Sequence, residues 1–201
     1  MKTLYRNVIF FCATVALTTQ HSVAGEKDDL AFYGERAVEL LRDAISRETA
    51  HGQGLVPAYA ESLKQVFLAA GFPPETLTIV PYGETASLVV RYKGDGSSGR
   101  EPILFSSHMD VVPADPESWL RHPFELQVDD TFFYGRGVLD NKFDVTILTT
   151  LFVWLKESGF VPNRDLVIAF TGDEESFQET VQQLSLIHIS EPTRLLSIAY
   201  A

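Results

Sequence analysis

One histidine and several carboxylates stand directly after apolar segments of this sequence. His108 and Asp110 follow one such segment, and Glu174 and Glu175 follow another. Imidazole nitrogens and carboxylate oxygens are donors that bind zinc, cobalt or manganese in proteins. Side chains two residues apart in an extended strand point to the same face, so Asp110 could fix the tautomer and orientation of a ligating His108. The structural alternative, a hydrogen-bonded histidine at a strand end beside a turn aspartate, is the commoner interpretation of such a pair by itself.

The adjacent Glu174 and Glu175 give further support to the hypothesis of a metal site. Two neighbouring carboxylates in a cleft repel each other unless a cation offsets their charge. One of them can bind a metal while the other accepts a proton from water whose pKa the metal lowers toward about 7. A solvated acidic turn is the structural alternative. Asp140, just before a predicted helix, is equally open to interpretation as a ligand or as a routine N-cap.

The hydrophobic pattern predicts the elements that must position these side chains. Amphipathic helices are expected at 29–48, 58–70 and 144–156, and strands at 76–80, 87–92, 103–107 and 166–170. Strands alternating with helices predict an α/β domain whose helices cover a largely parallel or mixed sheet. In such sheets, sites form beyond the carboxyl ends of the strands, so the loops that follow the strands at 103–107 and 166–170 should meet.

Composition limits the other classes of function. The chain has 201 residues, with 16 Lys and Arg against 27 Asp and Glu, for a net charge of −11. This acidic balance argues against a general nucleic-acid binder, which needs a basic face. The one cysteine can form neither an internal disulfide nor a cysteine-rich zinc site, so a metal must be held by His, Asp and Glu.

Residues 1–24 predict a secretory signal peptide. Basic Lys2 and Arg6 precede the apolar run 8–17, and the sequence Ser-Val-Ala ends at Ala24. The run is shorter than the about 20 residues that a membrane-spanning helix needs, so we expect no stable membrane anchor. We therefore expect cleavage after Ala24 and export to the periplasm or the medium. The alternatives are a buried N-terminal helix or an anchor.

Residues 185–201 predict a segment that is not native. The stretch has no clean helical or strand period, Pro192 would break a helix, and the string is similar to a translated sequencing adapter. A genuine last strand or helix is the alternative. The expected organisation is thus a signal peptide at 1–24, part of a catalytic domain at 25–184 and a non-native tail at 185–201.

Together the motifs between 103 and 175 resemble the M20 family of metallopeptidases. The matching pieces, in order, are Ser-His-Met-Asp-Val-Val-Pro at 107–113, Trp119 with His-Pro-Phe at 122–124, Tyr-Gly-Arg-Gly-Val-Leu-Asp-Asn-Lys at 134–142 and Thr-Gly-Asp-Glu-Glu at 171–175. The resemblance implies a three-layer α/β/α sandwich with a mixed, largely parallel sheet, here incomplete. It also implies hydrolysis of an amide bond in a small peptide or N-acyl amino acid.

The resemblance assigns a role to each candidate residue. His108, Asp140 and Glu175 would bind two divalent metal ions, zinc first, with cobalt or manganese as alternatives, and Asp140 would bridge them. Glu174 would be the general base, and Asp110 would orient His108. Arg136 and Lys142 could hold carboxylates near the site, but a solvated or structural ion pair is the alternative. Gly135 and Gly137 would let the Asp140 loop turn tightly, and Trp119 and Phe124 would pack.

The resemblance also implies parts that this sequence does not match. A further acidic ligand, a C-terminal histidine and an inserted lid domain, through which a full-length homodimer could form, are expected in the family. His188 lies outside any matching motif. The competing hypothesis is therefore a catalytically inactive fragment or a weak metal-binding module. A glycosidase with paired carboxylates is disfavoured, because adjacent glutamates do not face each other across a sugar and His108 would have no role.

Overall fold

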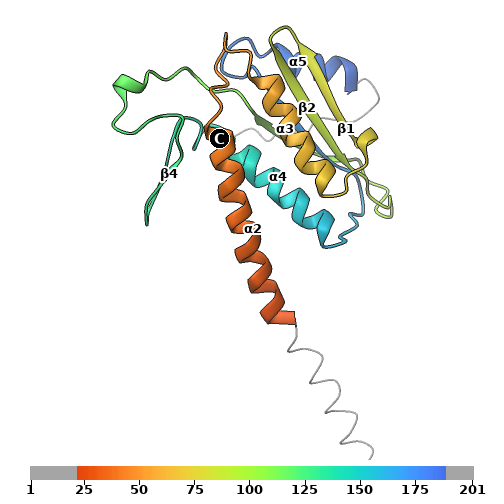
Figure 1. Ribbon diagram of the computed structural model, residues 1–201. Helices are drawn as coiled ribbons and strands as arrows, with labels where there is room; N and C mark the ends of the chain where they lie inside the picture. Colours follow the sequence, from red (N-terminus) through yellow and green to blue (C-terminus); the bar gives the residue numbers. More distant parts are fainter. Residues whose placement is uncertain (1–21, 189–201) are drawn as a thin grey trace, which may run out of the picture. The chain divides into compact units, whose positions relative to one another are not determined.

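The predicted elements occur in the expected order, and their ends shift by at most two residues except in the first helix, which spans Ser22–Ile45 where 29–48 was expected. The structure, a computed structural model, describes residues 22–188. The helices are α2 (Ser22–Ile45), α3 (Val56–Ala69), α4 (Lys142–Glu157) and α5 (Glu179–His188), with 3₁₀ turns at Pro74–Thr76 and Pro116–Ser118. The strands are β1 (Leu77–Tyr82), β2 (Thr85–Tyr92), β3 (Ile103–His108), β4 (Gln127–Val128), β5 (Phe133–Tyr134) and β6 (Leu166–Thr171) (Figure 1).

Helix α2 crosses the boundary between two units of the chain, which divides after Val38. The unit that begins at Glu39 holds every other element and all candidate site residues. The expected signal peptide lies outside the described residues except for 22–24, which belong to α2. Of the expected non-native tail, only 185–188 are described, as the end of α5. None of the described helices combines the length and apolar character of a membrane-spanning segment.

Four strands form a mixed sheet in the order β1-β2-β6-β3. The pairs β1–β2 and β2–β6 are antiparallel, and only β3–β6 is parallel. The expected mixed sheet is confirmed, but its largely parallel character was wrong for these strands. The short turn at Gly83 and Glu84 joins β1 to β2, and a tight turn of this kind can connect only antiparallel neighbours.

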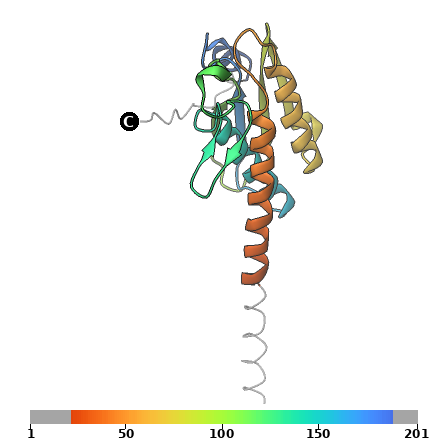
Figure 2. The same ribbon diagram turned by 60° about the vertical axis from the view of Figure 1, so that its left-hand side comes forward.

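Helices cover both faces of this sheet (Figures 1 and 2). Helix α3 packs on β1 and β2 and contacts α4, which packs on β3, while α5 contacts β2 from the other face. Side chains alternate between the faces along each strand. Leu88 and Ile168 are fully buried, whereas Ala169, the neighbour of Ile168, packs on the other face with Val80 and Leu184. Among the described residues, helices thus pack on both faces of a mixed four-strand sheet.

Helix α4 begins directly after the segment that carries Asp140. Its buried face includes Val145, Phe152 and Val153, which are inaccessible to solvent. The helix stops at Glu157, and Gly159 with a φ of 73° reverses the chain beyond it. The packed face therefore anchors the helix start, and with it the position of the Asp140 segment.

Strands β4 and β5 were not predicted from the sequence, and neither was helix α5. Strands β4 and β5 form a separate antiparallel ribbon in which Gln127 faces Tyr134 and Val128 faces Phe133. Each is two residues long, which is too short for an alternating pattern to be recognised.

Candidate metal centre

The parallel pair of strands brings the two carboxylate-bearing loops to one edge of the sheet. His108 is the last residue of β3 and lies opposite Thr171, the last residue of β6. Parallel strands that end in register release their loops at the same place, as expected from the sequence. Asp110 and the pair Glu174–Glu175 therefore lie on two loops that leave the sheet next to each other.

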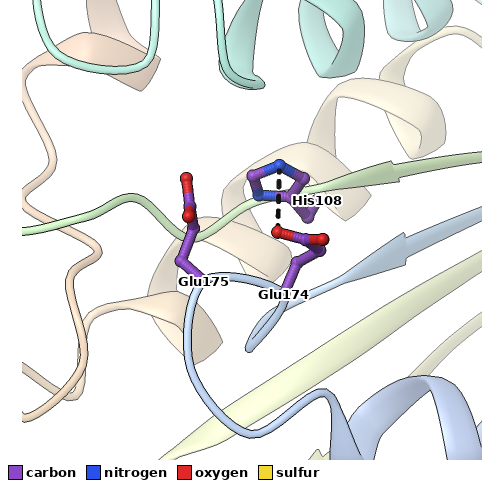
Figure 3. Close-up of side chains that lie close together, drawn as sticks. All are labelled: His108, Glu174 and Glu175. Atoms are coloured by element: carbon purple, nitrogen blue, oxygen red, sulfur yellow. Dashed lines mark ion pairs between the residues drawn. The ribbon is translucent and has the colours of Figure 1, made fainter.

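His108, Glu174 and Glu175 converge at this edge (Figure 3). One donor atom from each of the three lies within 4.8 Å of the others. The Nε2 atom of His108 is 3.9 Å from Oε2 of Glu174. His108 is buried, whereas the side chain of Glu174 is 45% exposed, so the group opens toward solvent on the glutamate side.

Asp140, on a third segment of the chain, contacts the same imidazole. Its Oδ1 atom lies 2.9 Å from Nε2 of His108, although the two residues are 32 positions apart. The N-cap of α4 is Asn141 and not Asp140, so the N-cap interpretation of Asp140 was wrong. Asp140 thus lies within hydrogen-bond distance of the His108 ring, and its side chain is largely exposed.

Asp110 links the histidine to the glutamate loop. Its Oδ1 atom is 3.3 Å from Nδ1 of His108, on the side of the ring that faces away from Asp140. The same carboxylate accepts hydrogen bonds from the backbone N–H groups of Glu174 (3.1 Å) and Glu175 (2.9 Å). Nδ1 also lies 3.1 Å from the backbone carbonyl of Asp110. Asp110 therefore orients the imidazole through both its carbonyl and its carboxylate, and the carboxylate holds the backbone of both glutamates.

Asp173 stabilises the same loop and was given no role by the sequence analysis. It is buried, and its carboxylate accepts hydrogen bonds from the backbone N–H groups of Glu179 (2.7 Å) and Thr180 (3.1 Å). These bonds satisfy N–H groups that the start of α5 leaves unpaired. A recognised helix start at Glu179 would have identified Asp173 as its anchor, but α5 was not predicted.

The surrounding carboxylates govern protonation of the site. Burial alone would lower the pKa of His108, but the hydrogen bonds and charges of Asp110 and Asp140 outweigh it and raise that pKa to about 9. The pKa of Glu175 is raised, first by burial and then by the charges of Asp140 and Glu174. Negative charge around the single imidazole contributes to both shifts, although burial is the first cause at Glu175.

We expect this excess of charge to appear in the pH dependence of stability. A raised pKa means that the folded chain holds the proton more tightly, so the stabilising contribution of His108 is complete below pH 6.5 and is lost as the pH rises through about 9. In EDTA, the free energy of unfolding of the 201-residue chain should exceed that of His108→Ala by a margin that shrinks over this interval. Urea unfolding at pH 6 and pH 9.5 measures it. A margin that grows with pH would contradict the assignment.

Within residues 22–188, neither Lys142 nor Arg136 pairs with a carboxylate, so neither the expected hold on a site carboxylate nor an ion pair is found there. The Nζ atom of Lys142 donates hydrogen bonds to the backbone carbonyls of Ala44 and Arg47. The guanidinium of Arg136 lies over the Trp119 ring at 5.2 Å. Because main-chain carbonyls carry no sequence signature, the partners of Lys142 could not be predicted.

The predicted role of Gly137 is confirmed. Its φ is 89°, and a Cβ atom at this position would approach Val111 to 2.9 Å and Lys142 to 3.0 Å. Both the left-handed backbone and the close packing require glycine. Phe124 is buried, as expected of a packing residue.

Comparisons with known proteins agree with this geometry. Residues 104–198 match the sequence model of peptidase family M20/M25/M40. A probable carboxypeptidase S-like protein of Dictyostelium discoideum is 40% identical over 90 residues, which are 44% of this chain and 17% of that protein. An acetylornithine deacetylase of the same organism is 35% identical over 100 residues, which are 48% of this chain and 22% of that protein. The chain thus spans about a fifth of the length of these relatives.

Solved structures show the same fold. A dipeptidase of Saccharomyces cerevisiae superimposes with a TM-score of 0.66 and 21% sequence identity, covering 82% of this chain and 37% of that one. The family match includes His108, Asp110, Asp140, Glu174 and Glu175. From sequence and fold together, the chain belongs to peptidase family M20/M25/M40.

Proposed function

We propose that residues 25–184 are the N-terminal part of a metal-dependent hydrolase that cleaves an amide bond in a small peptide or an N-acyl amino acid. The observation that carries the proposal is the convergence of His108, Glu174 and Glu175 within 4.8 Å. The names of the relatives support the reaction class, because a carboxypeptidase, a deacetylase and a dipeptidase all break carbon–nitrogen amide bonds.

The donor set suits divalent cations. One imidazole nitrogen and several carboxylate oxygens are ligands for zinc, cobalt and manganese. The charges of Asp140 and Glu174 add to burial in raising the pKa of Glu175, and a cation would relieve this repulsion. We propose His108, Asp140 and Glu175 as ligands of two such ions, with zinc first and cobalt or manganese as alternatives. Bound ions would polarise the scissile carbonyl and acidify the attacking water.

The protein's own groups would then move the proton. Glu174 is the proposed general base, because its exposed carboxylate stands beside the imidazole and can reach a water in the opening. It would take a proton from the water as the oxygen–carbon bond forms. It would return the proton to the nitrogen as the carbon–nitrogen bond breaks. Asp110 would not react: it would hold the His108 ring and the backbone of Glu174.

We also propose that the protein is exported from the cell. The order of a basic head, a short apolar run and a small-residue site in residues 1–24 supports a signal peptide with cleavage after Ala24. A periplasmic or secreted hydrolase would meet small peptides and N-acyl amino acids outside the cell. A homodimer through a lid domain is proposed only for a polypeptide of the relatives' length.

A second hypothesis is that the 201-residue chain by itself is inactive or binds metal only weakly. The observation that favours it is the coverage of about a fifth of the relatives' length. We expect the EDTA-treated and dialysed chain to bind fewer than two zinc equivalents and to hydrolyse neither dipeptides nor N-acetyl amino acids. A polypeptide that extends residues 25–184 to the relatives' length should bind two and turn over.

Equilibrium dialysis with metal analysis and an amine-release assay distinguish the two hypotheses. Two tightly bound ions with turnover in the 201-residue chain would overturn the inactive-fragment hypothesis. If the extended polypeptide also fails to bind zinc, the proposed hydrolase is wrong. The Glu175→Gln variant serves as the control, since it should lose zinc in whichever chain binds it.

A further inference from the structure

We propose that Lys142 is a positioning residue whose side chain sets the distance between Asp140 and His108. The inference rests on the proposed function, which makes these two residues metal ligands. Lys142 lies two positions after Asp140 at the first turn of α4, yet its ammonium group donates hydrogen bonds to main-chain carbonyls and not to a carboxylate of the site. Three sets of contacts carry the inference.

The first set ties Lys142 to the end of α2. Its side chain is fully buried, and Nζ donates to the carbonyl of Ala44 at 2.8 Å and to that of Arg47. The last carbonyls of a helix lack partners within the helix and attract positive charge. The ring of Tyr59 lies 5.7 Å from the same ammonium. Lys142 therefore caps α2 from a distance of about a hundred residues along the chain.

The second set ties the segment after α2 to the strand that carries the histidine. The Thr49 hydroxyl donates to the carbonyl of Met109 at 2.7 Å, and the N–H of Val111 donates to the carbonyl of Thr49 at 3.4 Å. Thr49 is itself buried. The residues 44–49 thus hold His108 and Asp110 on one side and Lys142 on the other. We call residues 44–49 the bracket.

The third set of contacts ties the position of the Asp140 loop, residues 137–142, to that of Lys142. The N–H of Lys142 donates to the carbonyl of Gly137 at 2.9 Å, which closes the loop 137–142 on itself. Gly137 also packs directly on the Lys142 side chain, which leaves no room for a Cβ atom. A loop this short and closed moves with its anchored end. Fixing Lys142 on the bracket therefore fixes Asp140 relative to His108.

We call the anchoring of the Asp140 loop through Lys142 the tether. The tether and a purely electrostatic role of Lys142 predict opposite changes in metal affinity when Lys142 is replaced. A positive charge close to a cation site weakens cation binding, so removing the charge of Lys142 would by itself raise the affinity for a divalent ion. Losing the tether would let Asp140 move away from His108 and would lower that affinity. Loss of an outer partner of a metal site costs about 10–100-fold in affinity. The sign of the change therefore decides between the two roles.

The experiment measures Co²⁺ and Zn²⁺ dissociation constants of the 201-residue chain and its variants. We expect Lys142→Met to weaken binding about tenfold or more and to alter the Co²⁺ absorption spectrum. Lys93→Met, which removes an exposed charge, controls for charge. Leu63→Ala, which opens the buried face of α3, controls for lost stability. Both controls should retain affinity and spectrum once corrected for the folded fraction. Unchanged or tighter binding by Lys142→Met would overturn the tether.

A second variant and a metal-free readout cover the remaining outcomes. Thr49→Val cuts the other side of the bracket without changing charge, and should weaken binding in the same direction if Lys142→Met does not fold. Amide hydrogen exchange in EDTA should rise at 137–142 and 44–49 in either variant but not in β1 and β2. If the unsubstituted 201-residue chain binds no metal, the inactive-fragment hypothesis holds for it, and exchange still tests the tether. Unchanged protection at 137–142 in Lys142→Met and Thr49→Val would then refute the tether.

Discussion

Replacing Glu174 with glutamine should lower the rate of amide hydrolysis by about 10²–10⁴-fold, the contribution of a well-placed general base. Glutamine keeps the shape of the side chain but cannot accept the proton of the attacking water. The backbone N–H of residue 174 would still donate to Asp110, so the loop should keep its place. Metal content should therefore change little. The measurement is kcat in a polypeptide of the relatives' length, with metal analysis of the same sample.

Two controls make the Glu174 result specific. Glu61→Gln is the same chemical change on the exposed side of α3 and should leave kcat and metal content unaltered. Glu175→Gln should lose metal as well as activity, because its carboxylate is a proposed ligand. If Glu174→Gln lost as much metal as Glu175→Gln, the roles of base and ligand would be misassigned.

Replacing His108 with alanine should weaken metal binding by more than about 100-fold, because even loss of an outer partner costs about 10–100-fold. His108 supplies the one nitrogen donor in the cluster of the described residues, and both of its ring nitrogens are engaged by carboxylates. Its removal also leaves Asp110 and Asp140 without their shared cationic or ligating partner. Titration with Zn²⁺ and loss of the Co²⁺ absorption bands would measure the effect.

His122 provides the matched control for His108. It is exposed, and its Nδ1 atom accepts a hydrogen bond only from the nearby backbone of Phe124. His122→Ala should therefore bind metal as the unsubstituted chain does. Retention of both ions by His108→Ala would remove the histidine from the proposed ligand set, whereas loss in both variants would indicate a general effect on folding.

The long elements could be predicted because their patterns are local. Helices α3 and α4 and strands β2, β3 and β6 bury alternating or helically spaced apolar residues, and their bounds differ from the expected ones by only a few positions. The site could be predicted for the same reason. Once β3 and β6 are buried strands, the polar residues that follow them belong at a sheet edge, where His108 and Glu174 are found.

Strand direction and short elements could not be predicted in this way. Whether β6 pairs with β2 parallel or antiparallel depends on residues more than 70 positions apart, such as Leu88 opposite Phe170. The apolar pattern of a buried strand is the same in either direction. Helix α5 begins where the carboxylate of Asp173 accepts hydrogen bonds from the backbone N–H groups of its first turn. The acidic residues 173–175 do not reveal this contact in the sequence.

The sequence by itself determined which side chains can bind a cation and at which ends of which elements they stand, because residue type and apolar period are properties of single segments. Only the tertiary structure decided how these segments are held together. Asp110 receives the backbone N–H groups of Glu174 and Glu175, and Lys142 reaches the carbonyl of Ala44. These bonds use main-chain atoms that every residue possesses, so they cannot be predicted from residue type. Only folding brings the partners within hydrogen-bond distance.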